Sequence, residues 1–232
     1  AVDTIRNPPP PDEDEPIKLA EAIRNMGLTY SVITVVNRDD MDDGGALHYK
    51  KCIDKVHEIC PKVGIEFLCS DLSGNVNALE FLLDNSPLTV FAHNVETVRR
   101  LTPRVRDPRA TFDQSLLILK KAKEFRPDII TKTSIMLGLG ETEEDLLNAF
   151  EELRVAKVDL LTLGQYLSPG PRYHPVVSFP SPETFDSLAQ IAKDMGFKAI
   201  ASGPMVRSSY RAESLVAAAK GETFDIELKV VS

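Results

Sequence analysis

Short apolar, β-branched runs alternate with segments of helical periodicity along this chain, and this alternation restricts the fold more than any other feature. Tyr30-Ser-Val-Ile-Thr-Val-Val36 lies within the first such run, Thr29–Val36, and its continuous apolar character predicts a strand buried on both faces. Further strands are predicted at residues 65–69, 88–91, 129–137, 160–163 and 198–201, and helices at 17–26, 47–59, 77–83, 111–124, 143–154 and 182–195. This order predicts right-handed βαβ units, and hence an α/β fold whose parallel strands form a closed or open barrel.

The chain divides into three predicted parts. Residues 1–16 combine prolines with acids and are expected to form an extended connector. Residues 17–212 form the barrel core, and residues 213–232 are expected to be a C-terminal tail. Gly27 lies where a left-handed residue would end the first helix.

The composition restricts the partners of the protein. Lys and Arg number 27 against 35 Asp and Glu, and the net charge of -8 argues against nonspecific binding to nucleic acid or to anionic membranes. No apolar run reaches the roughly 20 residues of a membrane span, and the first residues do not resemble a signal peptide. We therefore expect a cytoplasmic protein, or a mitochondrial one in a eukaryote, that acts on small molecules.

Two polar segments follow predicted strands, where α/β proteins gather their chemistry. In the first, acidic residues accompany Gly44 and Gly45, which would let a ligand approach the backbone; the alternative is an acidic turn. In the second, Asn94 and Glu96 offer polar groups suited to amines, carboxylates or sugars. Alternatively, Asn94 caps a helix that begins near residue 95. His93 is expected to be structural, because no partner lies at metal-ligand spacing.

The segment Leu137-Gly-Leu-Gly-Glu-Thr142 also follows a strand. It lacks the lysine of a phosphate-binding P-loop and the third glycine of a dinucleotide fingerprint, which excludes both interpretations. The remaining prediction is a tight turn into a helix capped by Thr142, with bare amides that an adenosine could meet. Leu163-Gly-Gln-Tyr-Leu167 is a similar strand end.

Lys132 lies inside a predicted apolar strand, where an unpaired ammonium group would be costly. It is either paired with an acid at the mouth of the barrel or acts as a Schiff-base nucleophile. A third polar segment, Gly203-Pro-Met-Val-Arg-Ser-Ser-Tyr210, places Ser208 and Ser209 beside arginines, which suggests an anion site or a helix cap. No Ser-His-Asp set is evident, since His174 has no marked partner.

Taken together, these segments resemble the lipoyl synthase family of radical S-adenosylmethionine enzymes over nearly the whole chain. The matching motifs are Val32-Ile-Thr-Val-Val-Asn-Arg-Asp-Asp40, Asp43-Gly-Gly-Ala46, His93-Asn-Val-Glu-Thr-Val98, Thr131-Lys-Thr133, Met136-Leu-Gly-Leu-Gly-Glu-Thr142, Leu163-Gly-Gln-Tyr-Leu167 and Val206-Arg-Ser-Ser-Tyr210. The resemblance implies insertion of two sulfur atoms into an octanoyl chain held by a lipoyl carrier protein. It also implies two [4Fe-4S] clusters and S-adenosylmethionine, from which a 5'-deoxyadenosyl radical is produced.

The resemblance assigns roles residue by residue. Gly44 and Gly45 would contact the methionine end of S-adenosylmethionine, and Asn94 and Glu96 its polar groups. The adenosine would lie near Gly138, Gly140, Glu141 and Gln165. Ser209, with Ser208 as second choice, would ligate the second cluster, which serves as sulfur donor, and Arg207 would steady that cluster or the radical site. The implied partners are octanoylated carrier proteins (E2 domains of dehydrogenase complexes or the glycine cleavage H protein) and an electron donor such as ferredoxin or flavodoxin.

The chain departs from this family in its cysteines. Cys52, Cys60 and Cys69 are widely spaced and do not form a cluster motif; we expect buried thiols in a reducing compartment. The cluster ligands and the first barrel strand are expected to precede Ala1, so this polypeptide alone should be inactive. Two other functions remain open: a non-catalytic module that binds the carrier protein or S-adenosylmethionine, and a barrel aldolase that uses Lys132.

Overall fold

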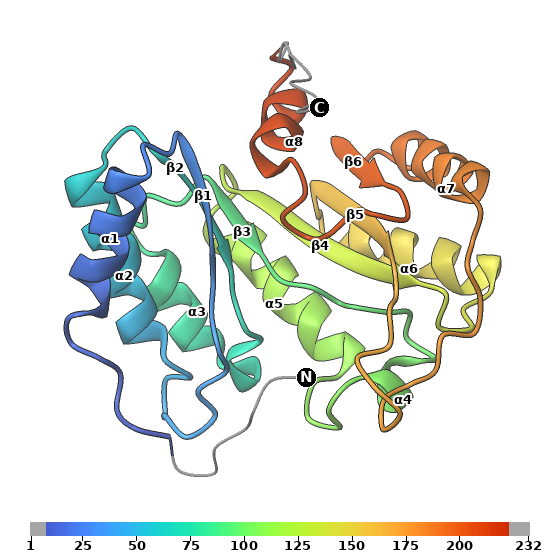
Figure 1. The fold of residues 1–232 in the computed structure, drawn as a ribbon, viewed down its shortest axis with the longest axis horizontal. Coiled ribbons are helices and arrows are strands. Elements are labelled where there is room, and N and C mark those ends of the chain that lie inside the picture. The colour runs from blue at the N-terminus through green and yellow to red at the C-terminus, as the bar shows by residue number, and fades with distance from the viewer. Residues whose placement is uncertain (1–7, 223–232) are drawn as a thin grey trace.

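A computed structural model describes residues 8–222 of the chain, in which six parallel strands form one sheet with the order β1-β2-β3-β4-β5-β6 (Figure 1). The strands are β1 (Tyr30–Thr34), β2 (Gly64–Leu68), β3 (Val90–Ala92), β4 (Ile130–Leu137), β5 (Leu160–Gln165) and β6 (Ala199–Ser202). The helices are α1 (Glu15–Asn25), α2 (Ala46–Ile59), α3 (Val76–Leu83), α4 (Thr102–Val105), α5 (Phe112–Phe125), α6 (Glu143–Val155), α7 (Pro182–Asp194) and α8 (Ala212–Ala219), with a 3-10 turn, η1, at Leu72–Gly74. The predicted open, parallel α/β barrel is confirmed.

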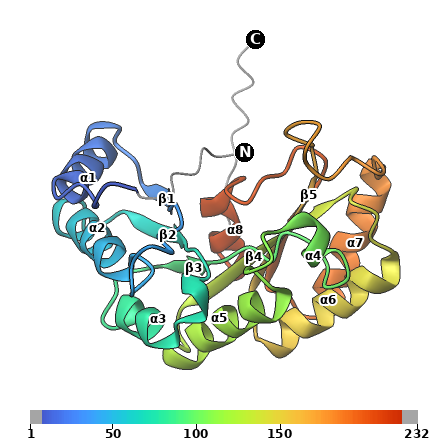
Figure 2. The ribbon, with the colours of Figure 1, turned by 90° about the horizontal axis from the view of Figure 1, so that it is seen from below.

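The sheet is curved, and most helices cover its outer face (Figure 2). Outward-facing side chains of the strands, among them Phe67, Phe91 and Leu161, are fully buried against these helices. Two apolar clusters result, one beneath α1, α2 and α3 and one beneath α6 and α7. The outward-facing positions of these strands are therefore apolar.

The inner face of the sheet is covered by α8 (Figure 2). Leu215 and Val216 of this helix pack with Val90, Ile130 and Leu160 of three neighbouring strands. The expected tail from residue 213 onward therefore begins with a helix that belongs to the core. Residues 223–232 and 1–7 lie outside the described residues.

Local signals placed most helix ends correctly. Thr111 accepts a hydrogen bond from the Gln114 amide at 3.1 Å and caps α5, as expected of an N-cap threonine. Gly27, with a φ of 64°, follows the end of α1. Helix α1 itself begins at Glu15, inside the expected connector, with Pro16 in its first turn.

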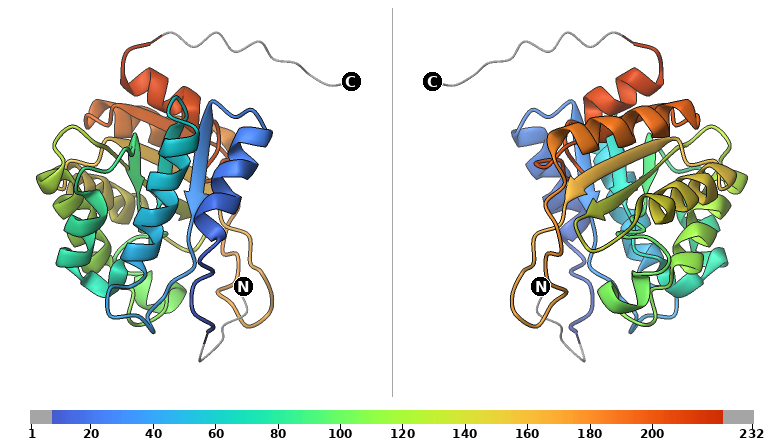
Figure 3. Two further views of the ribbon diagram at one scale, coloured as in Figure 1. Left: turned by 90° about the vertical axis from the view of Figure 1, so that its left-hand side faces the viewer. Right: turned by 90° about the vertical axis from the view of Figure 1, so that its right-hand side faces the viewer.

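The prediction for the first strand was wrong in one respect. Strand β1 lies at the edge of the sheet (Figure 3), and Ile33 is its one buried residue. The apolar run that suggested burial on both faces extends past the strand into residues 35 and 36, the second of which is exposed.

Candidate functional site

Polar side chains gather where β1, β2 and β3 end. A cavity of about 170 Å³ lies there, and its polar lining residues are Thr34, Asn37, Ser70, Asp71, His93, Asn94, Glu96 and Arg106. Within it, Asn94 Nδ2 donates a hydrogen bond to Glu96 Oε1 at 3.2 Å. The structure thus brings together Asn94 and Glu96, as the sequence predicted, at the carboxyl edge of a parallel sheet, where such folds bind ligands.

The backbone around Glu96 is fixed by β4. Glu96 N donates to Ser134 O at 3.0 Å, and Met136 N donates to Glu96 O at 2.8 Å, so pairing continues past the end of β3. Glu96 has a φ of 66°, a left-handed conformation that is uncommon for a non-glycine residue. The alternative that Asn94 caps a helix was wrong, because no helix begins near residue 95 and Glu96 instead forms an isolated parallel bridge with Ile135.

Opposite charges face each other in this cavity with little solvent. Burial raises the pKa of Glu96, and burial also lowers the pKa of Arg106, whose positive charge partly offsets the shift at Glu96. Arg106 was missed in the sequence, where it lies in a polar stretch before a helix. The one feature of the sequence that could have indicated Arg106 is the position of this stretch, which directly follows the motif that contains Asn94 and Glu96.

His93 has a structural role. Its Nδ1 lies 3.0 Å from Cys69 O, and its Nε2 lies 2.9 Å from Ser115 Oγ. A carbonyl only accepts, so Nδ1 carries the proton and Nε2 accepts from Ser115, which in turn accepts from Arg106 Nη1 at 2.7 Å. Burial lowers the pKa of His93 to about 4, which keeps the ring neutral. This chain of hydrogen bonds positions Arg106 in the cavity.

In the loop after β4, polar groups form hydrogen bonds with one another. Gly138 N and Leu139 N donate to the two carboxylate oxygens of Glu141 at 2.6 and 2.9 Å. The expectation of bare amides was therefore wrong for these two groups. Thr142 caps α6 as predicted, in a capping box with Asp145.

The side-chain amide of Gln165, at the end of β5, is also hydrogen-bonded within the fold. Its Nε2 donates to Leu137 O, Tyr166 O and Ser178 O at 2.9 to 3.2 Å. A Cβ added at Gly138 would lie 2.4 Å from Ser178 O and 2.5 Å from Gln165 Nε2, so this glycine is required by close packing.

Gly44 and Gly45 lie in a turn before α2. Gly44 N donates to Met41 O, and Gly45 N donates to Asp43 Oδ1 at 2.9 Å. A Cβ at Gly45 would lie 2.7 Å from the ring of Tyr49. These contacts support the alternative of an acidic turn, and neither glycine lines the cavity that holds Asn94 and Glu96.

The segment from Gly203 to Tyr210 lies against the end of β5. Arg207 Nη1 donates to Gln165 O at 3.3 Å and to Val206 O at 3.1 Å. Ser208 is half-buried and Ser209 is exposed. Arg207 therefore joins this segment to the carboxyl edge of the sheet, beside the strand that carries Gln165.

Lys132 is paired with an acid, as one of its two interpretations proposed. Its Nζ lies 2.7 Å from Glu66 Oε1, and Glu66 Oε2 accepts a hydrogen bond from Tyr30 at 3.0 Å. Both ion-paired side chains are almost fully buried, at 2% and 1% exposure. Because its amine is buried and ion-paired, the structure gives no support to a Schiff-base role.

The cysteines do not fit an iron–sulfur cluster. Cys52 lies on α2, Cys60 follows α2 and Cys69 follows β2, and all three are buried. Burial raises the pKa of Cys52 to about 11 and that of Cys69 further still, so these thiols are protonated unless a metal ion displaces the proton. Within residues 8–222 no set of three cysteines is arranged as cluster ligands.

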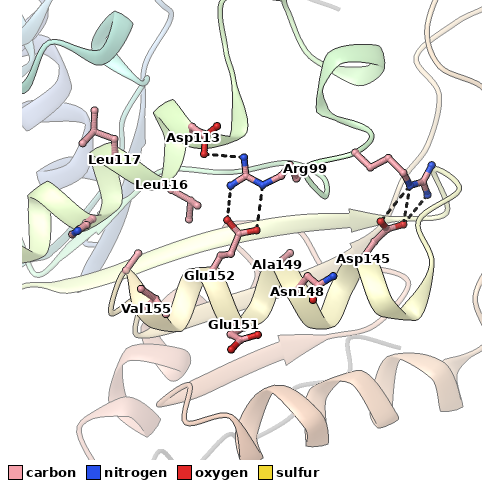
Figure 4. A pocket seen from close by; sticks show the side chains of 13 residues that line it. Arg99, Asp113, Leu116, Leu117, Asp145, Asn148, Ala149, Glu151, Glu152 and Val155 are labelled. Atoms are coloured by element: carbon pink, nitrogen blue, oxygen red, sulfur yellow. Dashed lines mark hydrogen bonds and ion pairs between the residues drawn. The ribbon is translucent and has the colours of Figure 1, made fainter.

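A larger cavity, of about 650 Å³, lies on the outer face between α5 and α6 (Figure 4). Five of its charged residues pair with one another: Arg99 with Asp113 and Glu152, and Arg100 with Asp145. None of the residues predicted for the site lies in this groove.

Among the described helices, none is long and apolar enough to cross a membrane.

Comparisons with known proteins show what the chain is similar to. The sequence model of the "Radical SAM superfamily" matches residues 2–153. The chain is 52% identical to the chloroplastic lipoyl synthase of Arabidopsis thaliana, over 93% of this chain and 54% of that protein. It is 51% identical to the lipoyl synthase of Thermus thermophilus, over 87% of this chain and 62% of that protein, and 51% identical to the mitochondrial lipoyl synthase of Bos taurus, over 91% and 57%. The chain thus spans little more than half the length of these relatives.

Two solved structures share the fold. The FeFe-hydrogenase maturase HydG from Carboxydothermus hydrogenoformans aligns with a TM-score of 0.60 and 17% identity, over 88% of this chain and 48% of that one. Methylornithine synthase (PylB) aligns with a TM-score of 0.54 and 14% identity, over 72% and 47%. At these identities the likeness concerns the arrangement of strands and helices alone.

Proposed function

We propose that this chain, which belongs to the radical SAM superfamily, is the barrel portion of a lipoyl synthase. The observation that carries the proposal is the identity of about half of the residues to lipoyl synthases over about nine-tenths of the chain. The reaction proposed for the whole protein is the insertion of two sulfur atoms into an octanoyl chain attached to a lipoyl carrier protein.

The cavity at the ends of β1, β2 and β3 is the proposed site for the polar part of S-adenosylmethionine. A half-buried carboxylate, an amide and a guanidinium group suit a molecule that carries an ammonium group, ribose hydroxyls and a carboxylate. We assign Glu96 and Asn94 to its donor groups, and Arg106 to its carboxylate. The enclosed volume of about 170 Å³ accepts only part of so large a molecule, so the remainder would extend along the strand ends.

The other predicted contacts are retained as weaker proposals. Gly138, Gly140, Glu141 and Gln165 would contact the adenosine through backbone surface and carbonyl oxygens, because the amides of Gly138 and Leu139 and the side-chain amide of Gln165 already have partners. Gly44 and Gly45 would contact the methionine end in the same way. Arg207 and Ser209, or Ser208 in its place, would serve the second cluster.

The cysteine ligands of both [4Fe-4S] clusters would come from parts of the protein outside this chain, since the described cysteines do not fit. Bound together, a reduced cluster and S-adenosylmethionine supply the radical chemistry of this superfamily. The role of the present residues is to bind and orient. The proposed partners are octanoylated E2 domains or the glycine cleavage H protein and a small electron-transfer protein, in the cytoplasm or, in a eukaryote, the mitochondrion.

The test uses the complete product of the natural gene, purified without oxygen and reconstituted with iron and sulfide. It is incubated with S-adenosylmethionine, a reductant and an octanoylated carrier-protein peptide. We expect mass spectrometry to detect the addition of two sulfur atoms to the peptide, and chromatography to detect 5'-deoxyadenosine. Binding of the peptide without either product would overturn the catalytic proposal in favour of a non-catalytic binding module.

A further inference from the structure

Three side chains with metal-binding atoms meet between α1 and α2, and none of them lines the cavity that holds Asn94 and Glu96. Glu15 is the first residue of α1, and His48 and Cys52 lie on α2. Their ligand atoms all lie within 4.8 Å of one another. Among the described residues, this is the one group of three or more His, Cys, Asp or Glu side chains with such proximity.

The sequence spacing explains why two of the three share a face. His48 and Cys52 are four residues apart, one helical turn, so both side chains project from the same side of α2. His48 Nε2 lies 3.7 Å from Cys52 Sγ and 2.6 Å from Glu15 Oε2. The same ring nitrogen therefore faces both neighbours.

These separations suit a tetrahedral ion. Bonds of about 2.0–2.3 Å at tetrahedral angles place neighbouring ligand atoms about 3.3–3.8 Å apart. The His48–Cys52 distance lies in this range without any movement. The carboxylate of Glu15 lies too close to His48 Nε2 for both to bind one ion, so it would have to move slightly away from that nitrogen. Its side chain can make this movement because it is 57% exposed.

A cavity of about 420 Å³ opens beside the three groups. Glu15, His48 and Cys52 line it together with residues 31–36 along the edge strand β1. Two basic side chains lie near this cavity. Arg38, which lines it, is hydrogen-bonded to Asp40, and Lys18 is hydrogen-bonded to Asp12. Their positive charges are thus paired and would not strongly repel a bound cation. The cavity leaves room for water to complete the coordination of an ion held by three protein ligands.

We propose that Glu15, His48 and Cys52 form a binding site for a zinc ion. One sulfur, one nitrogen and one carboxylate oxygen match the mixed ligand sets of Zn²⁺, whereas Mg²⁺ and Ca²⁺ prefer oxygen alone. A single cysteine excludes a conventional iron–sulfur cluster here. The ion would join the start of α1 to α2 beside the open edge of the sheet, and its binding would stabilise the folded chain.

The test titrates the chelator-treated, tag-free chain with Co²⁺ alone, and then displaces the cobalt with Zn²⁺. We expect one equivalent of Co²⁺ to bind with a thiolate-to-cobalt charge-transfer band, and Zn²⁺ to remove that band and raise the Tm. Cys52→Ser should abolish the band, and His48→Gln and Glu15→Gln should each weaken Zn²⁺ binding at least tenfold. Glu15→Gln alters an exposed side chain, so it tests the site even if Cys52→Ser perturbs folding.

Two matched controls come from the same part of the chain. Cys60→Ser removes a buried thiol that follows α2, and His57→Gln removes an exposed imidazole of α2; both variants should bind Co²⁺ as the unaltered chain does. Circular dichroism confirms that each variant is folded. Absence of the charge-transfer band from the unaltered chain, or its loss in Cys60→Ser instead of Cys52→Ser, overturns the proposal.

Discussion

The loops that follow β3 and β4 both contain a Glu-Thr pair but use their polar groups differently. Each loop carries a glutamate near a strand end, Glu96 in one and Glu141 in the other. Glu141 accepts two backbone amides of its own loop. Glu96 accepts one hydrogen bond, from Asn94, and otherwise faces a cavity that also holds Arg106.

This difference shows that the types of residue that follow a strand are not enough to identify a binding site. What matters is whether the loop has already satisfied its own donors and acceptors. In the loop after β4, Glu141 already holds the amides of Gly138 and Leu139. The loop after β3 presents a carboxylate and an amide to a cavity that Arg106 also lines, and its left-handed Glu96 is held in place by β4.

The first prediction tests whether the loop after β4 is structural. Gly138→Ala should lower the free energy of unfolding by roughly 3 kcal/mol, because the new methyl group would meet a backbone oxygen at 2.4 Å and the φ of 94° disfavours any side chain. Gly140→Ala is the matched control, with a similar φ of 99° but only ordinary contact with Val177, and should cost about 1 kcal/mol. Urea unfolding followed by circular dichroism measures both. Equal losses would mean that close packing at Gly138 is unimportant.

The second prediction tests whether the loop after β3 binds the ligand. In the complete protein, Asn94→Ala should weaken S-adenosylmethionine binding about tenfold, the equivalent of about 1.4 kcal/mol, while the unfolding free energy changes by less than about 0.5 kcal/mol. Asn148→Ala, at an exposed position of the outer groove, is the control and should alter neither quantity. Equilibrium dialysis with labelled ligand provides the affinities. Unchanged affinity in Asn94→Ala would remove this loop from the proposed site.

The sequence predicted the strands and most helices because their signals are local. Apolar runs, the cap at Thr111 and the glycine after α1 each act within a few residues of themselves. Helix α8 was missed because its partners are strands far away in the sequence, and four-residue α4 is too short to show periodicity.

The site was predicted less completely, for the same reason. Asn94 and Glu96 follow a strand and could be selected from the sequence alone. Arg106 joins them through Val95 O and through Ser115 and His93, and Ser115 comes from the next helix. The partners of Glu141 and Gln165 are likewise a matter of loop geometry, which residue types do not reveal.

The third prediction uses pH to test the capping box that follows the loop after β4. Hydrogen bonds from Arg100 and from Thr142 lower the pKa of Asp145 to about 2. A lowered pKa contributes stability above the unfolded value of about 3.8, and this contribution is lost as the pH falls toward 2. Asp145→Asn should therefore cost about 1 kcal/mol at pH 7 and little at pH 2, as measured by urea unfolding at both pH values. Glu144→Gln, a neighbouring exposed position, should show a smaller and less pH-dependent change; a pH-independent loss in Asp145→Asn would contradict the assignment.

The last prediction expects the opposite sign in the loop after β3. Burial raises the pKa of Glu96, so the folded chain holds this proton more tightly than the unfolded chain does. The ionised carboxylate therefore reduces stability as the pH rises from the ordinary value of 4.5 through the folded value, and the full reduction persists above it. Glu96→Gln preserves an oxygen that can accept from Asn94 but cannot ionise. Its unfolding free energy, relative to the unaltered chain, should increase slightly with rising pH and then level off, whereas that of Asp145→Asn should decrease. If both differences changed in the same direction, Glu96 would be satisfied within the fold as Glu141 is, and the contrast between the two loops would not explain where the ligand binds.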